Sequence, residues 1–100
     1  MKRLAVALLP FAFALTATAV QADGEATYNQ ACMACHMTGA AGAPIRGDAD
    51  AWAPRQEKGM DTLYDHAING FQAMPAKGGQ PALSDDEVKA AVDYMLEPTL

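Results

Sequence analysis

Apolar residues near the end of the chain recur at the spacing of an α-helix. Within "SDDEVKAAVDYML" (84–96) they fall on one stripe, formed by Val88, Ala91, Val92 and Met95. The segment opens with Ser84 and has Glu87 three residues later, which is the pattern of a capping box. The sequence therefore predicts an amphipathic helix over 84–96.

A second stripe with the same period lies in "DTLYDHAINGF" (61–71). Its members, at i, i+3, i+4 and i+7, are Tyr64, Ala67, Ile68 and Phe71. Gly70 is the C-terminal signal of this segment. The pattern predicts a helix that buries this stripe.

Two further segments predict helices from their composition and their end signals. "GEATYNQACMAC" (24–35) has good helix formers and no proline, and Asp23 is available as its N-cap. "DAWAPRQEKG" (50–59) is typical of a short helix with Asp50 as the cap, Pro54 in the first turn and Gly59 as the stop. Loops rich in glycine and proline follow over 39–44 and 72–83. Since no segment alternates β-branched with polar residues, we expect an all-α fold of short helices.

The first 22 residues have the pattern of a cleavable signal peptide. Two basic residues precede an apolar run over 4–20, and "VQA" closes that run at Ala22, with Ala19 as the alternative cleavage point. A retained membrane anchor is the other interpretation, but a run of about 17 residues is at the lower limit for a spanning helix, and Pro10 interrupts it. We expect residues 23–100 to form one small periplasmic domain with no stable membrane insertion after cleavage.

The charge of the exported part is strongly acidic. Residues 23–100 contain five basic and twelve acidic side chains, a net charge of −7. This balance excludes electrostatic binding to nucleic acid or to an anionic membrane surface. It would suit a partner with a basic docking face, although plain solubility is the commoner reason for such a charge.

Both cysteines of the chain lie in one five-residue motif, Cys32-x-x-Cys35-His36. This motif indicates covalent attachment of haem c, with the thiols bonded to the two vinyl groups and His36 as an iron ligand. A redox-active cysteine pair is expected beside a βαβ pattern, which is absent from the sequence. A zinc site would need a fourth ligand, for which His66 is the obvious nitrogen candidate. Haem would also supply the apolar interior that so small a domain lacks.

The sixth iron position separates an electron carrier from a gas-binding or peroxide-activating protein. The side chains that could fill it are Met33, Met37, Met60, Met74, Met95 and His66. We favour Met74, because Pro75 stiffens its loop and Gly78 and Gly79 allow the loop to lie close to a flat ligand. A methionine and a histidine together are the iron ligands of cytochromes c.

Several segments together resemble the class I cytochromes c, especially the short bacterial cytochrome c5 group. They cover nearly all of residues 23–100 and are "TYNQACMACH", "GAAGAPIRGD", "AWAPR", "KGMDTLYDHAINGFQAMPAKGG" and "LSDDEVKAAVDYM". The resemblance implies a helical fold around one haem, crossed first and last helices, His/Met iron and soluble electron transfer. Members of the c5 group often carry a second cysteine pair near the last helix, and "GGQPALSDDE" has none.

The resemblance also implies roles near the cofactor. Pro44 resembles the family proline whose carbonyl accepts the His36 ring N–H. Trp52 resembles a group near the haem propionates, with core packing as the alternative, and either Arg46 or Arg55 resembles another such group. Lys77 could mark the exposed haem edge.

The same resemblance assigns a helix contact. Gly24 and Tyr28 look like the face of the first helix that meets the last helix near Ala91 and Tyr94.

These expectations combine into one function. We expect a non-enzymatic carrier, a monomer or weak dimer, that passes single electrons between respiratory redox partners. The alternatives are a peroxidase or gas-binding protein with a labile sixth ligand and an electron-transfer subunit of a larger complex.

Overall fold

A computed structural model describes residues 23–100, which are helical throughout apart from turns and one isolated bridge between Phe71 and Met74. The elements in chain order are α1 (Gly24–Thr27), η1 (Tyr28–Cys32), α2 (Met33–His36), η2 (Ala40–Gly42), α3 (Ala49–Gln56), α4 (Met60–Asn69), η3 (Ala76–Gly79), α5 (Asp85–Leu96) and η4 (Glu97–Thr99). Here η1 is π-helical and η2 to η4 are 3-10 turns. The all-α prediction is confirmed. The predicted signal peptide over 1–22 lies outside the described residues.

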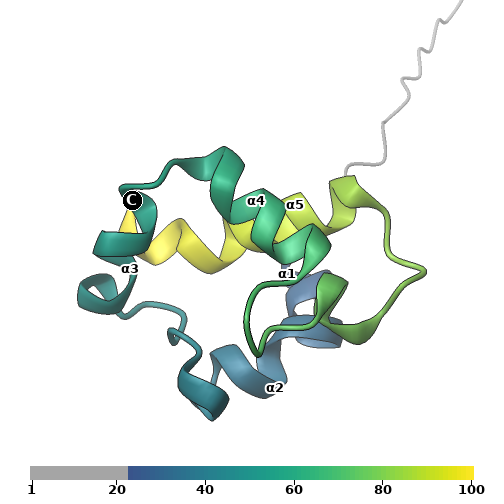
Figure 1. Cartoon of the computed structure of the whole chain (residues 1–100), viewed down its shortest axis with the longest axis horizontal. Helices are drawn as coiled ribbons and strands as arrows, with labels where there is room; N and C mark the ends of the chain where they lie inside the picture. The colour runs from purple at the N-terminus through teal and green to yellow at the C-terminus, as the bar shows by residue number, and fades with distance from the viewer. Residues whose placement is uncertain (1–22) are drawn as a thin grey trace, which may run out of the picture.

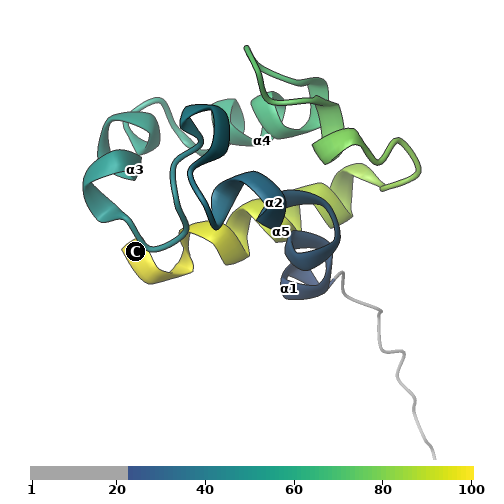
Figure 2. The same cartoon turned by 90° about the horizontal axis from the view of Figure 1, so that it is seen from below.

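The helices surround a common centre. Figure 1 shows α2, α3, α4 and the segment that follows α4 arranged around it, with α5 running across behind. Figure 2, seen from below, shows α1 beside α5 and α3 at the far end of the molecule. In residues 23–100 no helix is both long enough and apolar enough to cross a membrane.

The first predicted helix forms, but it is not uniform. The side chain of Asp23 accepts a hydrogen bond from the backbone N–H of Ala26 at 3.2 Å, so the predicted cap is confirmed. The chain then changes to wider π-helical turns over η1 before the α-helical geometry returns in α2. Such single-turn widenings are frequent at functional sites, and this one directly precedes the cysteine motif.

The predicted cap of α3 is wrong by two residues. Asp48, and not Asp50, is the N-cap, and its Oδ1 accepts the Ala51 N–H at 3.2 Å. Pro54 consequently lies in the second turn and not in the first. The competing signal was close by in the sequence, since either aspartate can cap a helix.

The predicted buried stripe of α4 is also wrong in part. α4 ends at Asn69 with Gly70 as its C-cap, so Phe71 lies in the following turn and is 39% exposed. The buried residues of α4 are Leu63 and Ala67, which face α5, whereas Tyr64 is only half-buried. Tyr64 instead donates its hydroxyl hydrogen to Asp93 of α5, at 2.5 Å.

The prediction for α5 is confirmed in detail. Ser84 and Glu87 form the reciprocal capping box, with bonds of 3.0 and 2.8 Å. The whole predicted stripe is buried, and Leu96 is buried with it; the stripe is Val88, Ala91, Val92 and Met95. This helix therefore forms one side of the core for the rest of the chain.

The first and last helices cross in close contact, as the resemblance implied. A Cβ atom on Gly24 would lie 2.2 Å from the Ala90 carbonyl oxygen, so only glycine allows this approach. Beside the crossing the rings of Tyr28 and Tyr94 are tilted against each other, with centroids 5.3 Å apart.

Gly24→Ala should lower the free energy of unfolding by about 1–3 kcal/mol, because the added methyl group overpacks the helix crossing. The measurement is thermal or denaturant unfolding of the mature protein. Gln30→Ala, at an exposed position of η1, should change the same free energy by less than about 0.5 kcal/mol. Equal stability of Gly24→Ala and the wild type would contradict the close crossing.

Candidate functional site

The helices enclose a cavity of about 600 Å³ with a mostly apolar lining. Its back wall is α5, through Val88, Val92 and Met95, and α4 contributes Leu63 and Ala67. All four residues proposed to attach the haem or bind its iron also line it, namely Cys32, Cys35, His36 and Met74. The structure thus brings the main predicted site residues to one space.

The two cysteines lie one helical turn apart at the junction of η1 and α2. Both are free thiols and both are half-buried. Burial raises the pKa of Cys32 to about 11, so this thiol is protonated at neutral pH. Both cysteines line the cavity, three residues apart in sequence.

His36 is held in a defined orientation at the end of α2. Its Nδ1 lies 2.7 Å from the carbonyl oxygen of Pro44, to which it donates, and this leaves Nε2 for the cavity. Burial lowers the pKa of His36, the Pro44 hydrogen bond opposes that shift, and the charge of Arg55 adds to it. The imidazole is therefore neutral at neutral pH, which is the form that binds metal.

The chain after α2 turns back sharply to deliver Pro44. Gly39 adopts φ +82°, and the Arg46 N–H donates to the His36 carbonyl at 2.9 Å. The Trp52 ring is stacked near the His36 ring, with centroids 6.0 Å apart and planes 22° apart. The histidine is thus held by a carbonyl at one nitrogen and by an indole beside its ring.

Met74 reaches the cavity from a short turn. Phe71 and Met74 exchange two backbone hydrogen bonds, of 3.0 and 2.9 Å. Beyond Met74, Gly78 passes so close to η1 that a Cβ there would lie 2.3 Å from the Ala31 carbonyl oxygen. Gly78 thus permits a close approach to the helix that carries the cysteines, whereas the predicted approach of this loop to a flat ligand stays a prediction.

The structure separates the six candidates for the sixth iron ligand. Met74, Met95 and His66 line the cavity, whereas Met33 and Met60 pack on the core and Met37 is 59% exposed. Met95 is 4% exposed within the stripe of α5, so it is a core side chain first. The ring of His66 is stacked on the ring of Phe71, a contact that the sequence did not suggest.

Trp52 takes the role of a core residue. It is 6% exposed, and its indole N–H donates to the Ile45 carbonyl at 3.0 Å. The indole N–H thus has a backbone acceptor, and the expected position of Trp52 near the haem propionates stays a prediction. Trp52 still lines the cavity through its ring.

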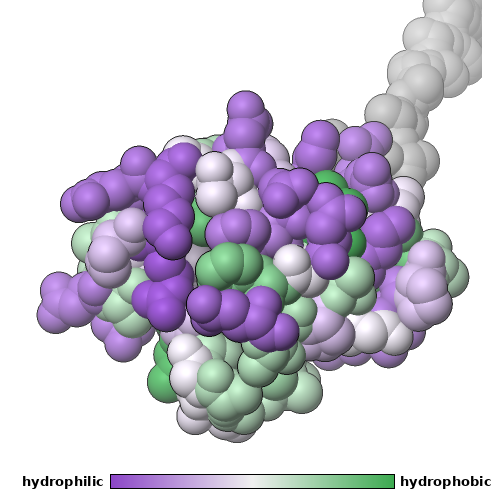
Figure 3. All heavy atoms as spheres, in the orientation of Figure 1, coloured by the Kyte–Doolittle hydropathy of each residue, from purple (hydrophilic) through white to green (hydrophobic). Residues whose placement is uncertain are grey.

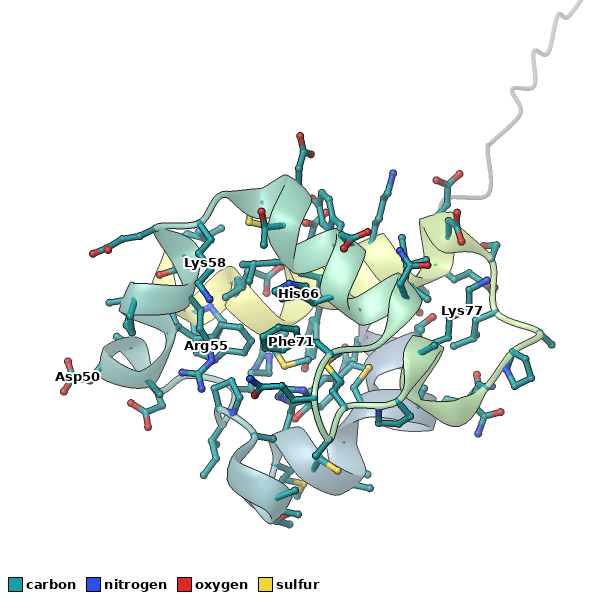
Figure 4. The ribbon with its side chains drawn as sticks, in the orientation of Figure 1. Asp50, Arg55, Lys58, His66, Phe71 and Lys77 are labelled. Carbon is teal, nitrogen blue, oxygen red and sulfur yellow. The ribbon has the colours of Figure 1, made fainter. Side chains whose placement is uncertain are left out.

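The two arginines have different surroundings. Arg46 is directed away from the cavity, with Nε 3.0 Å from the Tyr94 carbonyl oxygen and its guanidinium 3.8 Å above the Tyr94 ring centroid. Arg55 lines the cavity and is anchored to the Ala51 carbonyl at 2.6 Å. Figure 4 shows Arg55 and Lys58 on the same side of the central space, and Lys58 also lines the cavity.

Lys77 is a fixed part of the cavity wall. Its Nζ donates to the Leu83 carbonyl at 2.8 Å and lies 3.3 Å from a carboxylate oxygen of Asp85. The lysine that was expected to mark a cofactor edge thus also ties η3 to the start of α5.

The donor set fits a haem better than the alternatives. An apolar cavity bordered by two thiols, a neutral imidazole and a thioether suits an iron porphyrin. Among residues 23–100 no group of three or more His, Cys, Asp or Glu is placed to hold a metal ion by itself, which removes the support for zinc. The βαβ surroundings of a redox-active cysteine pair are also absent from this range.

Comparisons of the sequence with known proteins give independent evidence about the cofactor of this cavity. Residues 19–95 match the family model described as cytochrome C oxidase, cbb3-type, subunit III. Cytochrome c-555 of Chlorobaculum tepidum is 49% identical over 75% of this chain and 73% of its own length. Cytochrome c5 of Azotobacter vinelandii is 42% identical over 73% of this chain and 90% of its own length.

A solved structure shares the fold as well. It is described as an electron transfer complex of nitrite reductase with cytochrome c, and its matching chain is 41% identical, with a TM-score of 0.73 over 78% of this chain and 95% of that chain. This chain belongs to the class I cytochromes c. The cytochrome carries one covalently bound haem c with its iron, and proteins of this class are electron carriers rather than enzymes.

Sequence reasoning missed two features of the cavity lining. They are Lys58 and the stacked pair of His66 and Phe71. The Lys58 ammonium lies 5.8 Å from the Phe71 ring centroid. A helical wheel could not find the stack, because Phe71 lies beyond the end of α4.

Arg55→Gln should lower the reduction potential of the cytochrome, because a cation at the cavity disfavours the additional positive charge of oxidised iron. The interaction is on the order of 1 kcal/mol at surface-like dielectric, or about 40 mV for one electron. Arg46→Gln removes the same charge outside the cavity and should give a smaller shift in a redox titration. Equal shifts would contradict the different placement of the two arginines.

Proposed function

We propose that this cytochrome is a periplasmic carrier of single electrons with its haem attached at Cys32 and Cys35 and ligated by His36 and Met74. Residues 1–22 are its cleavable signal peptide and residues 23–100 its monohaem domain. The protein acts between respiratory oxidoreductases as a monomer or weak dimer. With both axial positions filled by side chains, the iron has no open site for a substrate.

The observation that carries this proposal is the convergence of the four side chains on one apolar cavity. His36 is neutral and oriented by Pro44, so it is ready to bind iron through Nε2. Met74 is the lining methionine that comes from a loop and not from the core stripe of α5. When bound, haem c supplies the one-electron couple, and the chain supplies attachment, ligation and an apolar surrounding that tunes the potential.

The N-terminal sequence supports the proposed periplasmic location. The apolar run over 4–20 and its basic start supply the export signal. This pattern favours export of residues 23–100 to the periplasm.

Met74→Leu should abolish the weak absorption band that an iron–methionine bond gives in the oxidised protein. The isosteric apolar side chain keeps the packing but removes the sulfur ligand. The variant should also bind carbon monoxide rapidly in the reduced state, since the sixth position is then open. Absorption spectroscopy of the purified holoprotein makes both measurements.

Met95→Leu and Met60→Leu are the matched controls, because they make the same change at the core positions. Both should retain the band. Loss of the band in Met95→Leu or in a His66 variant, with retention in Met74→Leu, would overturn the proposed ligand. Rapid carbon monoxide binding by the wild type would favour the gas-binding alternative.

The charges around the cavity indicate what kind of surface a redox partner would contact. Among residues 23–100 the charged side chains that line the cavity are Arg55, Lys58 and Lys77, and no Asp or Glu lines it. The chain from Ala26 to Ile45, which carries the cysteine motif, contains no Asp, Glu, Lys or Arg. The acidic balance therefore belongs to the remainder of the surface.

The exposed surface beside the attachment motif is apolar. Met37 is 59% exposed and Ile45 39% exposed, and Figure 3 shows the surface over α2 and η2 mostly in pale green, with purple over α3 and α4. We therefore favour a partner contact that is uncharged at its centre, with any basic face of the partner meeting the acidic periphery. Such a contact places little charge between donor and acceptor.

Met37→Glu should slow electron self-exchange between oxidised and reduced copies by about tenfold, because two like charges would face each other at the contact. Line broadening in NMR spectra of mixed oxidation states measures this rate without any other partner. Lys89→Gln changes the net charge by the same amount on α5, away from the cavity lining, and should leave the rate close to that of the wild type. Equal slowing in both variants would mean that net charge, and not this surface, controls the encounter.

A further inference from the structure

The segment that carries Met74 is held at both ends by other elements. At its C-terminal end, the backbone of Gly78 lies directly on Ala31 of η1. At its N-terminal end, the Phe71 ring is stacked on the imidazole of His66, with centroids 3.8 Å apart and planes 9° apart. Met74 lies between these two contacts, so its position depends on both.

The turn between Phe71 and Met74 requires external support. Gln72 adopts φ +54°, a left-handed conformation that costs free energy for a residue with a Cβ atom. Two backbone hydrogen bonds join Phe71 directly to Met74, so a displacement of Phe71 displaces Met74 with it. A contact that fixes the Phe71 ring therefore also fixes the methionine.

His66 is well placed to give that support. It projects from α4, one position before the buried Ala67, and its own carbonyl accepts the Gly70 N–H at 2.9 Å. Its ring is half-buried and lines the cavity beside Phe71. Figure 4 shows the two side chains together at the centre of the molecule, with Lys58 to one side.

We propose that His66 is a positioning residue that holds the Met74 turn in place through its stack on Phe71. The inference rests on the proposed ligation of the iron by Met74. Without the imidazole the turn would open more often and the thioether would leave the iron more readily. The usual strength of an aromatic pair corresponds to an increase of about three- to tenfold in that opening.

The test compares His66→Ala with His66→Phe in the holoprotein. His66→Ala should raise the rate of carbon monoxide binding by the reduced protein and the hydrogen exchange of the Met74 amide, each by about three- to tenfold. The iron–methionine band should also fade at a lower temperature. His66→Phe keeps a flat ring against Phe71 and should restore all three properties toward the wild type.

Tyr64→Phe is the matched control on the same helix. It removes the hydroxyl bond to Asp93 and so weakens the packing of α4 on α5 without touching the turn. This variant should leave carbon monoxide binding and Met74 exchange unchanged. If His66→Ala also leaves them unchanged, or if Tyr64→Phe changes them as much, the positioning role is wrong.

Failure of the proposed ligation has a different signature. In that case the wild-type protein itself lacks the iron–methionine band. Hydrogen exchange of the Met74 amide, which is bonded to the Phe71 carbonyl, then still decides whether His66 holds the turn. A wild-type rate in His66→Ala would rule out that support as well.

Discussion

The apolar cavity between α2, α4 and α5 is the constraint on which the rest of the structure depends. Among residues 23–100 few side chains are buried completely, and Leu96 is the largest of them. The faces of α4 and α5 that turn inward, through Leu63, Val88 and Val92, meet the cavity and not only each other. A rigid apolar cofactor must therefore complete the core, which couples haem binding to folding.

Attachment and stability share the same helix. The cysteine motif follows the α1 crossing on α5 through the π-helical segment η1, so the close approach at Gly24 also helps to set the direction of the turn that carries the motif. The neutral, hydrogen-bonded state of His36 follows from burial in the cavity and from the return of the chain to Pro44. Packing and ligand chemistry are thus consequences of one arrangement.

Local signals were sufficient where the partners of a residue lie close in sequence. The capping box and stripe of α5 and the Asp23 cap were predictable because each depends on residues within a few turns. The choice between Asp48 and Asp50 was not, since both satisfy the same local rule. The same holds for the site residues. The motif at Cys32 to His36 could be recognised from the sequence alone. The acceptor of the Trp52 N–H could not, because it depends on how the loop at Ile45 folds back.

A flexible composition can still deliver a rigid ligand when its ends are fixed. The segment after α4 is rich in glycine and proline, and its backbone includes left-handed residues at Gln72 and Lys77. Contacts at Phe71 and Gly78 convert this segment into a short span with little freedom between two helices. Under the proposed ligation by Met74 this matters directly, because an iron ligand that stays in place in both oxidation states keeps the structural change on electron transfer small. In the proposed arrangement the His66 ring stabilises the Met74 turn through its stack on Phe71, without acting as an iron ligand itself.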